Sequence, residues 1–246
     1  MPRFFVDLPT APDAEIVLSG ENAAHMERVL RMRTGECFTV CDGRGTDYIC
    51  TLTRYADKQA YGAIVSIEAN RAEPPAPLVL FQGLPKADKM ELILQKAVEL
   101  GATTIVPVAT ERSVVRLNGK EAAKTDRWRK IVEAAAKQSG RGLIPEVTLP
   151  MTLAQSLDMA KPLGCCAAAY EKEESQTLNA FLGTHEQAAR QGGFGVFIGP
   201  EGGFEAHEIG ALAASGIPPV TLGRRILRTE TAGLTVLSAV TCLWNW

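Results

Sequence analysis

Eight residues, NRAEPPAP at 70–77, divide the sequence into two parts with different hydrophobic periodicity. Three of the last four residues are prolines, and proline lacks the backbone N–H that a helix interior or a central strand requires. No continuous element can cross this stretch, so the pattern predicts a linker. The chain of 246 residues is therefore expected to form a small domain over residues 1–72 and a larger one over 73–246.

Short apolar runs separated by turn residues dominate the first part. The expected strands are residues 3–8, 37–43, 47–55 and 62–69. Strands of this length and spacing predict a small β-barrel. Residues 25–35 are the one helical segment expected within it, and they include Arg31 and Arg33.

The second part alternates apolar runs with amphipathic helical patterns. Strands are expected at residues 78–84, 103–108, 162–170, 194–200 and 219–223. Helices are expected around residues 90–98, 127–137, 205–215 and 232–246. Pro107 should lie near the end of its strand or on an edge. Apolar strands that alternate with helices predict an α/β fold with a parallel sheet covered on both faces.

Charge is unevenly distributed along the chain, although its net value is only −2. Residues 111–142 contain nine Lys or Arg and four acidic residues, whereas residues 143–210 contain three and nine. The net charge argues against a globally basic nucleic-acid binder. The basic segment is what contact with a phosphate backbone would require, but a solvated helix face has the same composition, and both readings stay open.

Several classes of protein are disfavoured by what the sequence lacks. It has no signal-peptide pattern and no apolar run of about 20 residues, so a soluble cytoplasmic protein without a membrane partner is expected. Six cysteines without a CxxC pair indicate reduced thiols in the core. Three widely spaced histidines provide no metal site.

A glycine-rich segment, Gly199-Pro200-Glu201-Gly202-Gly203, follows the strand expected at 194–200. In a parallel sheet, ligands bind beyond the carboxyl ends of the strands, where glycine lets a ligand approach the backbone. A tight turn is the simpler alternative. The segment is neither a P-loop nor GxGxxG, which weakens the case for a phosphate or dinucleotide site.

A second charged segment, LGRRILRTETAG at 222–233, precedes the last expected helix. It places Arg224, Arg225, Arg228 and Glu230 beside the apolar pair Ile226-Leu227. Charges so dense between buried elements are costly unless they meet a ligand or one another. A ligand site and a salt-bridged helix start are both compatible with the pattern.

These two segments together resemble the C-terminal signature of the SPOUT RNA methyltransferases, specifically the bacterial 16S ribosomal RNA uridine-N3 methyltransferase family. Further stretches carry the same resemblance over most of the chain. They are RFFV, VLRMRTGE, LPKADKMELILQKAVELGATTIVPVATERSV, RWRKIVEAAAKQSGR and IPEV.

The resemblance implies a fold, a cofactor and partners. The expected fold is a SPOUT-type parallel sheet with a C-terminal trefoil knot, preceded by a PUA-like β-barrel that helps to hold RNA. The expected cofactor is S-adenosylmethionine, and the expected partners are 16S rRNA in the small ribosomal subunit and a second copy of the chain. The C-terminal CLWNW is either a dimer contact or a terminus folded back onto its own core. The residues expected to bind the cofactor are Gly199, Pro200, Glu201, Gly202, Gly203, Leu222, Gly223, Ile226 and Leu227.

Catalytic roles follow from the same resemblance. Arg228 is expected to stabilise the anion that forms at N3 of uridine or to place a phosphate, and Glu201 or Glu230 to act as base or to orient an arginine. Structural roles compete: Glu230 pairing with Arg225 or Arg228, and Glu201 capping the next helix. The residues expected to contact RNA are Lys86, Arg112, Arg116, Arg127, Gln138, Arg141, Arg31 and Arg33.

Two other functions are compatible with the sequence. One is a non-catalytic RNA-binding or ribosome-assembly protein on the same fold, which would bind RNA without the cofactor. The other is a nucleotide-binding metabolic enzyme, which the missing phosphate-binding motifs disfavour.

Overall fold

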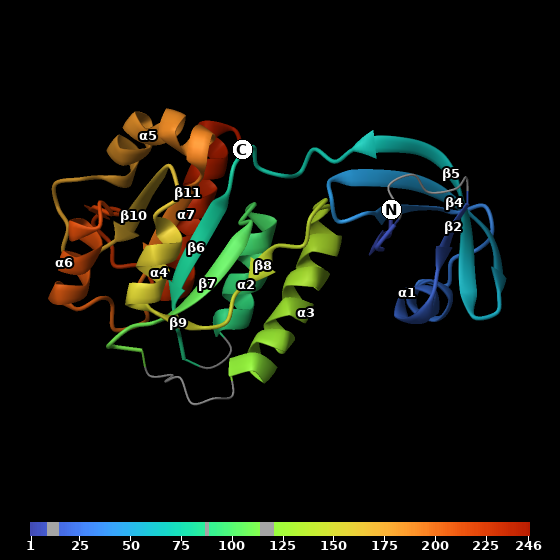
Figure 1. The fold of residues 1–246 in the computed structure, drawn as a ribbon, viewed down its shortest axis with the longest axis horizontal. Helices are drawn as coiled ribbons and strands as arrows, with labels where there is room; N and C mark the ends of the chain where they lie inside the picture. Colours follow the sequence, from blue (N-terminus) through green and yellow to red (C-terminus); the bar gives the residue numbers. More distant parts are fainter. Residues whose placement is uncertain (9–14, 87–88, 114–120) are drawn as a thin grey trace. The chain divides into compact units, whose positions relative to one another are not determined.

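The computed structural model describes residues 1–8, 15–86, 89–113 and 121–246 (Figure 1). The chain forms two compact units. The first consists of Met1–Glu73 and Ala136–Ile144, and the second of Pro74–Ala135 and Pro145–Trp246. The proline-rich stretch thus opens the second unit, and a short later segment returns to the first.

The first unit is built on a five-stranded sheet in the order β1-β3-β4-β5-β2. The pair β1 and β3 is parallel and the other neighbouring pairs are antiparallel. The strands are β1 Arg3–Phe5, β2 Glu15–Leu18, β3 Cys37–Cys41, β4 Thr46–Ala56 and β5 Gln59–Ala69. The turn Asp57-Lys58 between β4 and β5 has φ of 51° and 61°, as a type I′ turn requires. The sequence pattern does not predict β2, which is only four residues long and pairs with distant β5.

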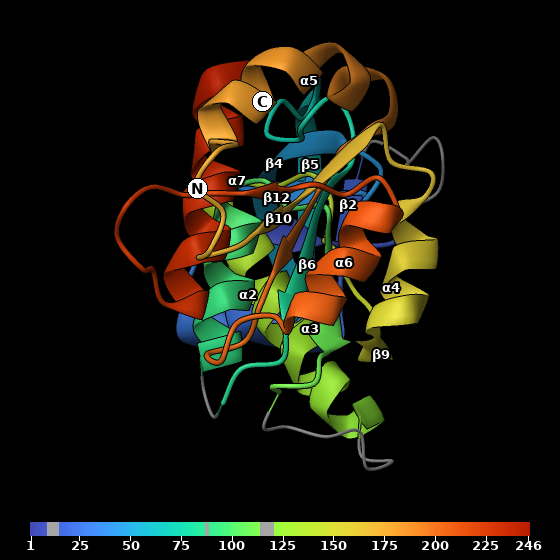
Figure 2. The same cartoon turned by 90° about the vertical axis from the view of Figure 1, so that its left-hand side faces the viewer.

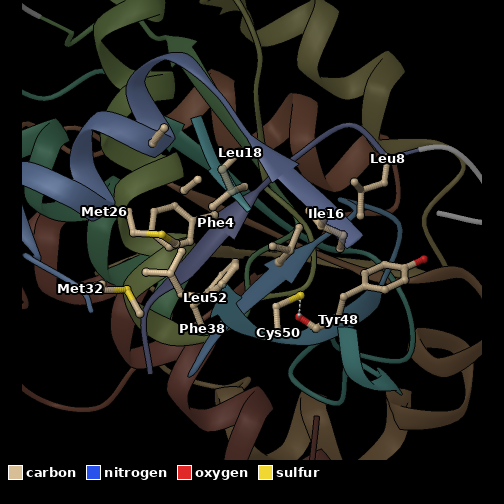
Figure 3. Packing of buried hydrophobic residues seen from close by; sticks show 13 residues of the cluster. Phe4, Leu8, Ile16, Leu18, Met26, Met32, Phe38, Tyr48, Cys50 and Leu52 are labelled. Atoms are coloured by element: carbon tan, nitrogen blue, oxygen red, sulfur yellow. Dashed lines mark hydrogen bonds between the residues drawn. The ribbon is translucent and has the colours of Figure 1, made fainter. Parts of the chain in front are cut away.

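Helical structure in the first unit begins before the predicted segment and ends within it. α1 spans Gly20–Ala24 and continues as a π-helical turn over His25–Val29. Met26 from this turn is fully buried in the core. Figure 3 shows Phe4 and Phe38 in the same core, where their rings meet edge to face with centroids 6.1 Å apart.

Arg141 is the clearest correction to the predicted RNA contacts. Its side chain is 3% exposed and lies in the first unit. Nε and Nη2 donate to the two carboxylate oxygens of Glu73 at 2.9 and 2.6 Å, and the backbone N–H groups of Gly142 and Leu143 also donate to Glu73. A guanidinium so enclosed is not available to a phosphate, because it is itself buried and already bonded to both oxygens of a partly buried carboxylate.

The second unit contains a seven-stranded sheet in the order β12-β10-β11-β6-β7-β8, with β9 also paired to β7. Its pairings are all parallel, which confirms the predicted sheet type. The strands are β6 Leu78–Gly83, β7 Thr104–Ala109, β8 Glu146–Val147, β9 Met151–Thr152, β10 Cys165–Ala169, β11 Phe194–Ile198 and β12 Pro219–Val220.

Helices cover both faces of this sheet. They are α2 Lys89–Glu99, α3 Glu121–Ser139, α4 Leu153–Ala160, α5 Leu178–Gly192, α6 Ala206–Ala214 and α7 Thr229–Trp244. Figure 2 shows α2 and α7 on one side of the strands and α4 and α6 on the other. Along β6, Val79 and Phe81 pack into the α4 and α6 side, while Leu80 and Gln82 lie beneath Gly233 of α7. This alternation of side chains is what a strand buried on both faces requires.

Two details of the second unit depart from expectation. α4 and α5 were not predicted, although Thr152 and Gln155 form a capping box and Thr177 caps α5. Pro107 sits in the middle of the sheet, opposite Gln82 of β6. On its other side β8 pairs with Thr104 and Ile105, and β9 pairs with Val108 and Ala109. The missing N–H of Pro107 therefore falls in the interval between two short strands.

The six cysteines are free thiols, as predicted, but Cys37 and Cys242 are exposed rather than in the core. At the C-terminus, Trp244 is 2% exposed, and its Nε1–H donates to the carbonyl of Leu182. This terminus is thus folded back onto its own core. Among the helices in the described part of the chain, none combines the length and apolarity needed to cross a membrane. The described residues also contain no group of three or more His, Cys, Asp or Glu side chains placed to hold a metal ion.

Candidate functional site

A cavity of about 490 Å³ lies where β10, β11 and β12 end. This is the carboxyl edge of the parallel sheet, where ligands bind in folds of this class, and the volume suits a small organic ligand. The nine residues predicted to bind a cofactor all line it, together with Arg228. The structure therefore brings the glycine-rich segment 199–203 and the arginine-rich segment 222–228 to one site; they are called below the glycine loop and the arginine loop.

The glycine loop is a tight turn that also forms a wall of the cavity. The backbone N–H of Gly203 donates to the carbonyl of Pro200 at 2.9 Å. Gly203 has φ of 69°, and a Cβ there would lie 3.0 Å from Oε1 of Glu171 at the rim of the cavity. Gly83 on β6 makes a second close approach, because a Cβ would lie 2.6 Å from the nitrogen of Pro200. The segment is thus a tight turn that also lines a cavity, so a tight turn and a ligand-binding role are compatible.

Thr229, the first residue of α7, ties the glycine loop to the last helix. Its Oγ1 donates to the carbonyl of Gly199 at 2.6 Å and accepts from Nε2 of Gln82 at 2.8 Å. Both polar side chains are buried, so these bonds are protected from water. Sequence reasoning missed Thr229 and Gln82, because a lone threonine before a helix signals only a cap.

The arginine loop carries cations that the fold leaves unpaired. Arg224, Arg225 and Arg228 are exposed, and none has a side-chain hydrogen bond or ion pair with any residue in the described ranges. Arg228 precedes the first residue of α7, where the helix dipole disfavours a positive charge. Ile226 between them is 84% exposed. Exposed arginines are hydrated and cost little, but three of them beside the cavity, unpaired with any described residue, leave positive charge available to an anionic ligand.

The alternative prediction, that Glu230 at the start of α7 pairs with Arg225 or Arg228, is wrong. Glu230 lies 3.2 Å from Nζ of Lys89 rather than beside Arg225 or Arg228. The same ammonium lies 3.1 Å from Oε1 of Glu201. Lys89 lines the cavity and was not among the predicted site residues.

Glu201 does not cap the helix that follows it. Its carboxylate accepts from the backbone N–H of Lys86, at 3.1 and 3.3 Å, and pairs with Lys89. The capping carboxylate of α6 belongs to Glu208, which accepts from the backbone N–H of Glu205 at 2.9 Å. Burial alone would raise the pKa of Glu201, but backbone N–H donors and Lys89 outweigh it and lower that pKa. Glu201 is therefore held ionised, which makes it a weak proton acceptor.

The other residues predicted to contact RNA have different surroundings. Arg112 donates to Glu205 and to the carbonyl of Gly202, both at 2.6 Å, yet its side chain remains 37% exposed. Arg127 pairs with Glu91 at 2.5 Å and is 68% exposed. The remaining members are exposed and have no side-chain hydrogen bond or ion pair with any described residue: Lys86, Gln138, Arg31 and Arg33. Arg116 lies outside the described residues, and Arg141 is buried as described above.

Comparison with known proteins places both parts of the chain. Residues 72–241 match the family model of the RNA methyltransferase domain, and residues 18–65 match that of the RNA methyltransferase PUA domain. The ribosomal RNA small subunit methyltransferase E of Bacillus subtilis is 34% identical over 98% of this chain and 96% of its own length.

Two solved structures extend the likeness to the fold. The ribosomal RNA small subunit methyltransferase E of Neisseria gonorrhoeae, bound to S-adenosyl methionine, has a TM-score of 0.86 and 32% identity, covering 99% of this chain and 98% of that one. A methyltransferase of Legionella pneumophila in complex with the same cofactor has a TM-score of 0.78 and 32% identity, covering 98% and 97%.

Proposed function

Because this chain belongs to the RNA methyltransferase family of the ribosomal RNA small subunit methyltransferases E, we propose that it methylates N3 of a uridine in 16S rRNA. The observation that carries the choice of chemistry is the cavity itself. One wall is a glycine loop that presents backbone groups, and the other carries three arginines that pair with none of the described residues. Such a site can hold a small cofactor and stabilise negative charge on a substrate beside it.

The cofactor is S-adenosylmethionine, and the cavity fits it. The side chains of Ile198, Leu222 and Leu227 offer apolar surface, while the glycine loop offers backbone donors and acceptors within reach of a ligand. When bound, the cofactor supplies an electrophilic methyl group on a sulfonium. The chain's part is to hold the acceptor nitrogen in line with that methyl group, since alignment lowers the barrier to displacement.

Arg228 is the residue we assign to the reacting base. N3 of uracil carries a proton, which must pass to solvent water during methyl transfer because the site offers no suited carboxylate base. Since N3 lies between two carbonyl groups, loss of this proton spreads negative charge over the nitrogen and both oxygens. A guanidinium presents several N–H donors in a planar fork and cannot itself lose its charge. Because no residue of the described chain neutralises Arg228, its full charge is available to the anion.

Glu201 and Glu230 are better suited to positioning than to proton abstraction. Both contact the ammonium of Lys89, and the pKa of Glu201 is lowered. A general base works best with a pKa near the operating pH, which the lowered pKa of Glu201 opposes, and Glu230 is occupied by its ion pair with Lys89. We therefore assign these two carboxylates to the geometry of the site.

The remaining expectations form part of the same proposal. Residues 1–72 hold RNA and residues 73–246 carry the reaction, with a trefoil knot in the C-terminal segment. The enzyme acts as a homodimer in the cytoplasm, on 16S rRNA of the small ribosomal subunit. The residues assigned to the rRNA backbone are Lys86, Arg112, Arg116, Arg127, Gln138, Arg31 and Arg33.

Labelled S-adenosylmethionine and unmodified small ribosomal subunits test the proposal, followed by nucleoside analysis of the rRNA. The expected product is 3-methyluridine. A methyl group at another atom would leave a methyltransferase with a different acceptor and refute the N3 assignment. No incorporation and no cofactor binding by calorimetry would instead indicate a non-catalytic RNA-binding protein.

A further inference from the structure

Lys89 joins two carboxylates from distant parts of the second unit. Its Nζ lies 3.1 Å from Oε1 of Glu201 in the glycine loop and 3.2 Å from Oε2 of Glu230 in the first turn of α7. The three side chains are 29%, 28% and 17% exposed. This partial burial leaves their charges less screened than those of a surface pair.

The position of Lys89 in its own helix is locally unfavourable. It is the first residue of α2, where the helix dipole favours an acidic side chain over a lysine. Residues that disfavour their own secondary structure occur most often at functional sites. The two carboxylates offset that cost, so tertiary contacts rather than helix propensity explain a lysine here.

Electrostatics makes the arrangement depend on the cation. The hydrogen bond to Glu201 raises the pKa of Lys89, which keeps the ammonium charged. Without that charge, two carboxylates would face each other from two segments of one site. Both carboxylates lie within 3.2 Å of the same ammonium, so without it they would repel each other. The glycine loop and the start of α7 would then move apart, or one carboxylate would take up a proton.

We propose that Lys89 is a positioning residue that clamps the glycine loop to the start of α7 and thereby sets the width of the cavity. The inference rests on the proposed function only in taking S-adenosylmethionine as the ligand of that cavity. Lys89 acts through Glu201 and Glu230, and its role is to hold both walls at the separation that the ligand requires.

The glycine loop and the start of α7 are joined by a hydrogen bond as well as by the Lys89 bridge. Thr229 already bonds to the carbonyl of Gly199 at 2.6 Å, but a single hydrogen bond permits rotation about it. The Lys89 bridge joins Glu201 and Glu230, each close in sequence to one end of that bond. Two separated contacts define an orientation, and Arg228 lies two residues before Glu230. The bridge thus also orients the arginine assigned to the reacting base.

Substitution of Lys89 separates this role from simple packing. Lys89→Met keeps most of the side-chain length and removes the charge, and should weaken S-adenosylmethionine binding about tenfold in calorimetry. Lys89→Met/Glu230→Gln removes the repulsion as well, and should recover most of that loss. Lys96→Met is the matched control, because it breaks an exposed ion pair with Glu99 on the same helix and should leave binding unchanged.

Hydrogen exchange in the cofactor-free protein provides a readout independent of ligand and catalysis. Lys89→Met should speed exchange in residues 199–203 and 229–233, and the double variant should slow it again. Unchanged exchange and binding in Lys89→Met would overturn the inference. So would a loss that Glu230→Gln does not recover, since that would show a packing role. If the wild-type protein binds no S-adenosylmethionine, the proposed function fails, and the exchange experiment still decides the role of Lys89.

Discussion

Arg141 and Arg228 both lie in basic, glycine-containing segments, yet the fold treats them in opposite ways. Arg141 is 3% exposed and bonded to both oxygens of Glu73. Arg228 is exposed at the rim of the cavity, without a side-chain partner in the part of the chain that the structure describes. A buried cation must be paired to be tolerated, whereas an unpaired cation beside a cavity remains available to a ligand.

The contrast shows how a chain divides its basic residues between stability and binding. Glu73 lies within the linker and accepts hydrogen bonds from Arg141 and two backbone N–H groups, so one carboxylate holds residues 141–143 within the first unit. In the arginine loop, by contrast, Arg224, Arg225 and Arg228 have no carboxylate partner among the described residues, and Glu230 pairs with Lys89 instead.

Arg141→Ala should have the largest effect, a loss of about 3 kcal/mol in the free energy of unfolding, because it leaves the partly buried carboxylate of Glu73 without a cation and with only its two backbone donors. Urea denaturation followed by circular dichroism measures it. Arg129→Ala is the control, since it removes an exposed pair with Asp126 and should change stability little. If Arg141→Ala keeps its stability but binds rRNA more weakly, Arg141 contacts RNA, and its contrast with Arg228 is wrong.

Arg228→Ala should slow methyl transfer about 10² to 10³-fold and leave the midpoint of urea unfolding unchanged. Steady-state kinetics on small ribosomal subunits divides its two possible roles. A fall in kcat indicates stabilisation of the anion, whereas a rise in KM for rRNA alone indicates placement of a phosphate. Lys161→Ala, which removes an exposed pair with Asp158 on α4, should change neither parameter.

Lowering the pH should weaken the ion pair between Arg141 and Glu73 and leave the arginine loop unaffected. Burial would raise the pKa of Glu73, but Arg141 and the two backbone donors outweigh it and lower that pKa below its ordinary 4.5. Its contribution to stability is therefore complete above pH 4.5 and is lost as pH falls through the lowered value. Urea unfolding between pH 7 and pH 3 should show this loss in the wild-type protein and a shallower slope in Glu73→Gln. Equal slopes would show that the pair contributes nothing.

Arg112→Ala should have the smallest effect. Arg112 is paired, as Arg141 is, but its side chain is 37% exposed. Its pair with Glu205 is largely solvated, so the urea midpoint should not move. Affinity for rRNA should fall modestly, and the slope of log affinity against log salt should decrease by about 1. An unchanged slope would remove Arg112 from the RNA-binding surface.

Much of the fold follows from local patterns in the sequence. The sequence predicts the proline-rich linker, the parallel sheet and helices such as α2, because hydrophobic periodicity and turn residues act over a few neighbouring positions. α4 and α5 were not predicted, although both are amphipathic and have N-terminal caps, so the local signal was present and went unused. β2 depends on a distant partner strand.

The candidate site divides in the same way. The sequence by itself determined the two loops and the family, because glycine and arginine at these spacings carry a chemistry of their own. Only the tertiary structure decided which polar and charged groups are paired: Arg141 with Glu73 across 68 positions, Gln82 with Thr229 across 147, and Lys89 with both glutamates. Pairing depends on distance in space and on exclusion of water, and neither is a property of a local stretch of chain.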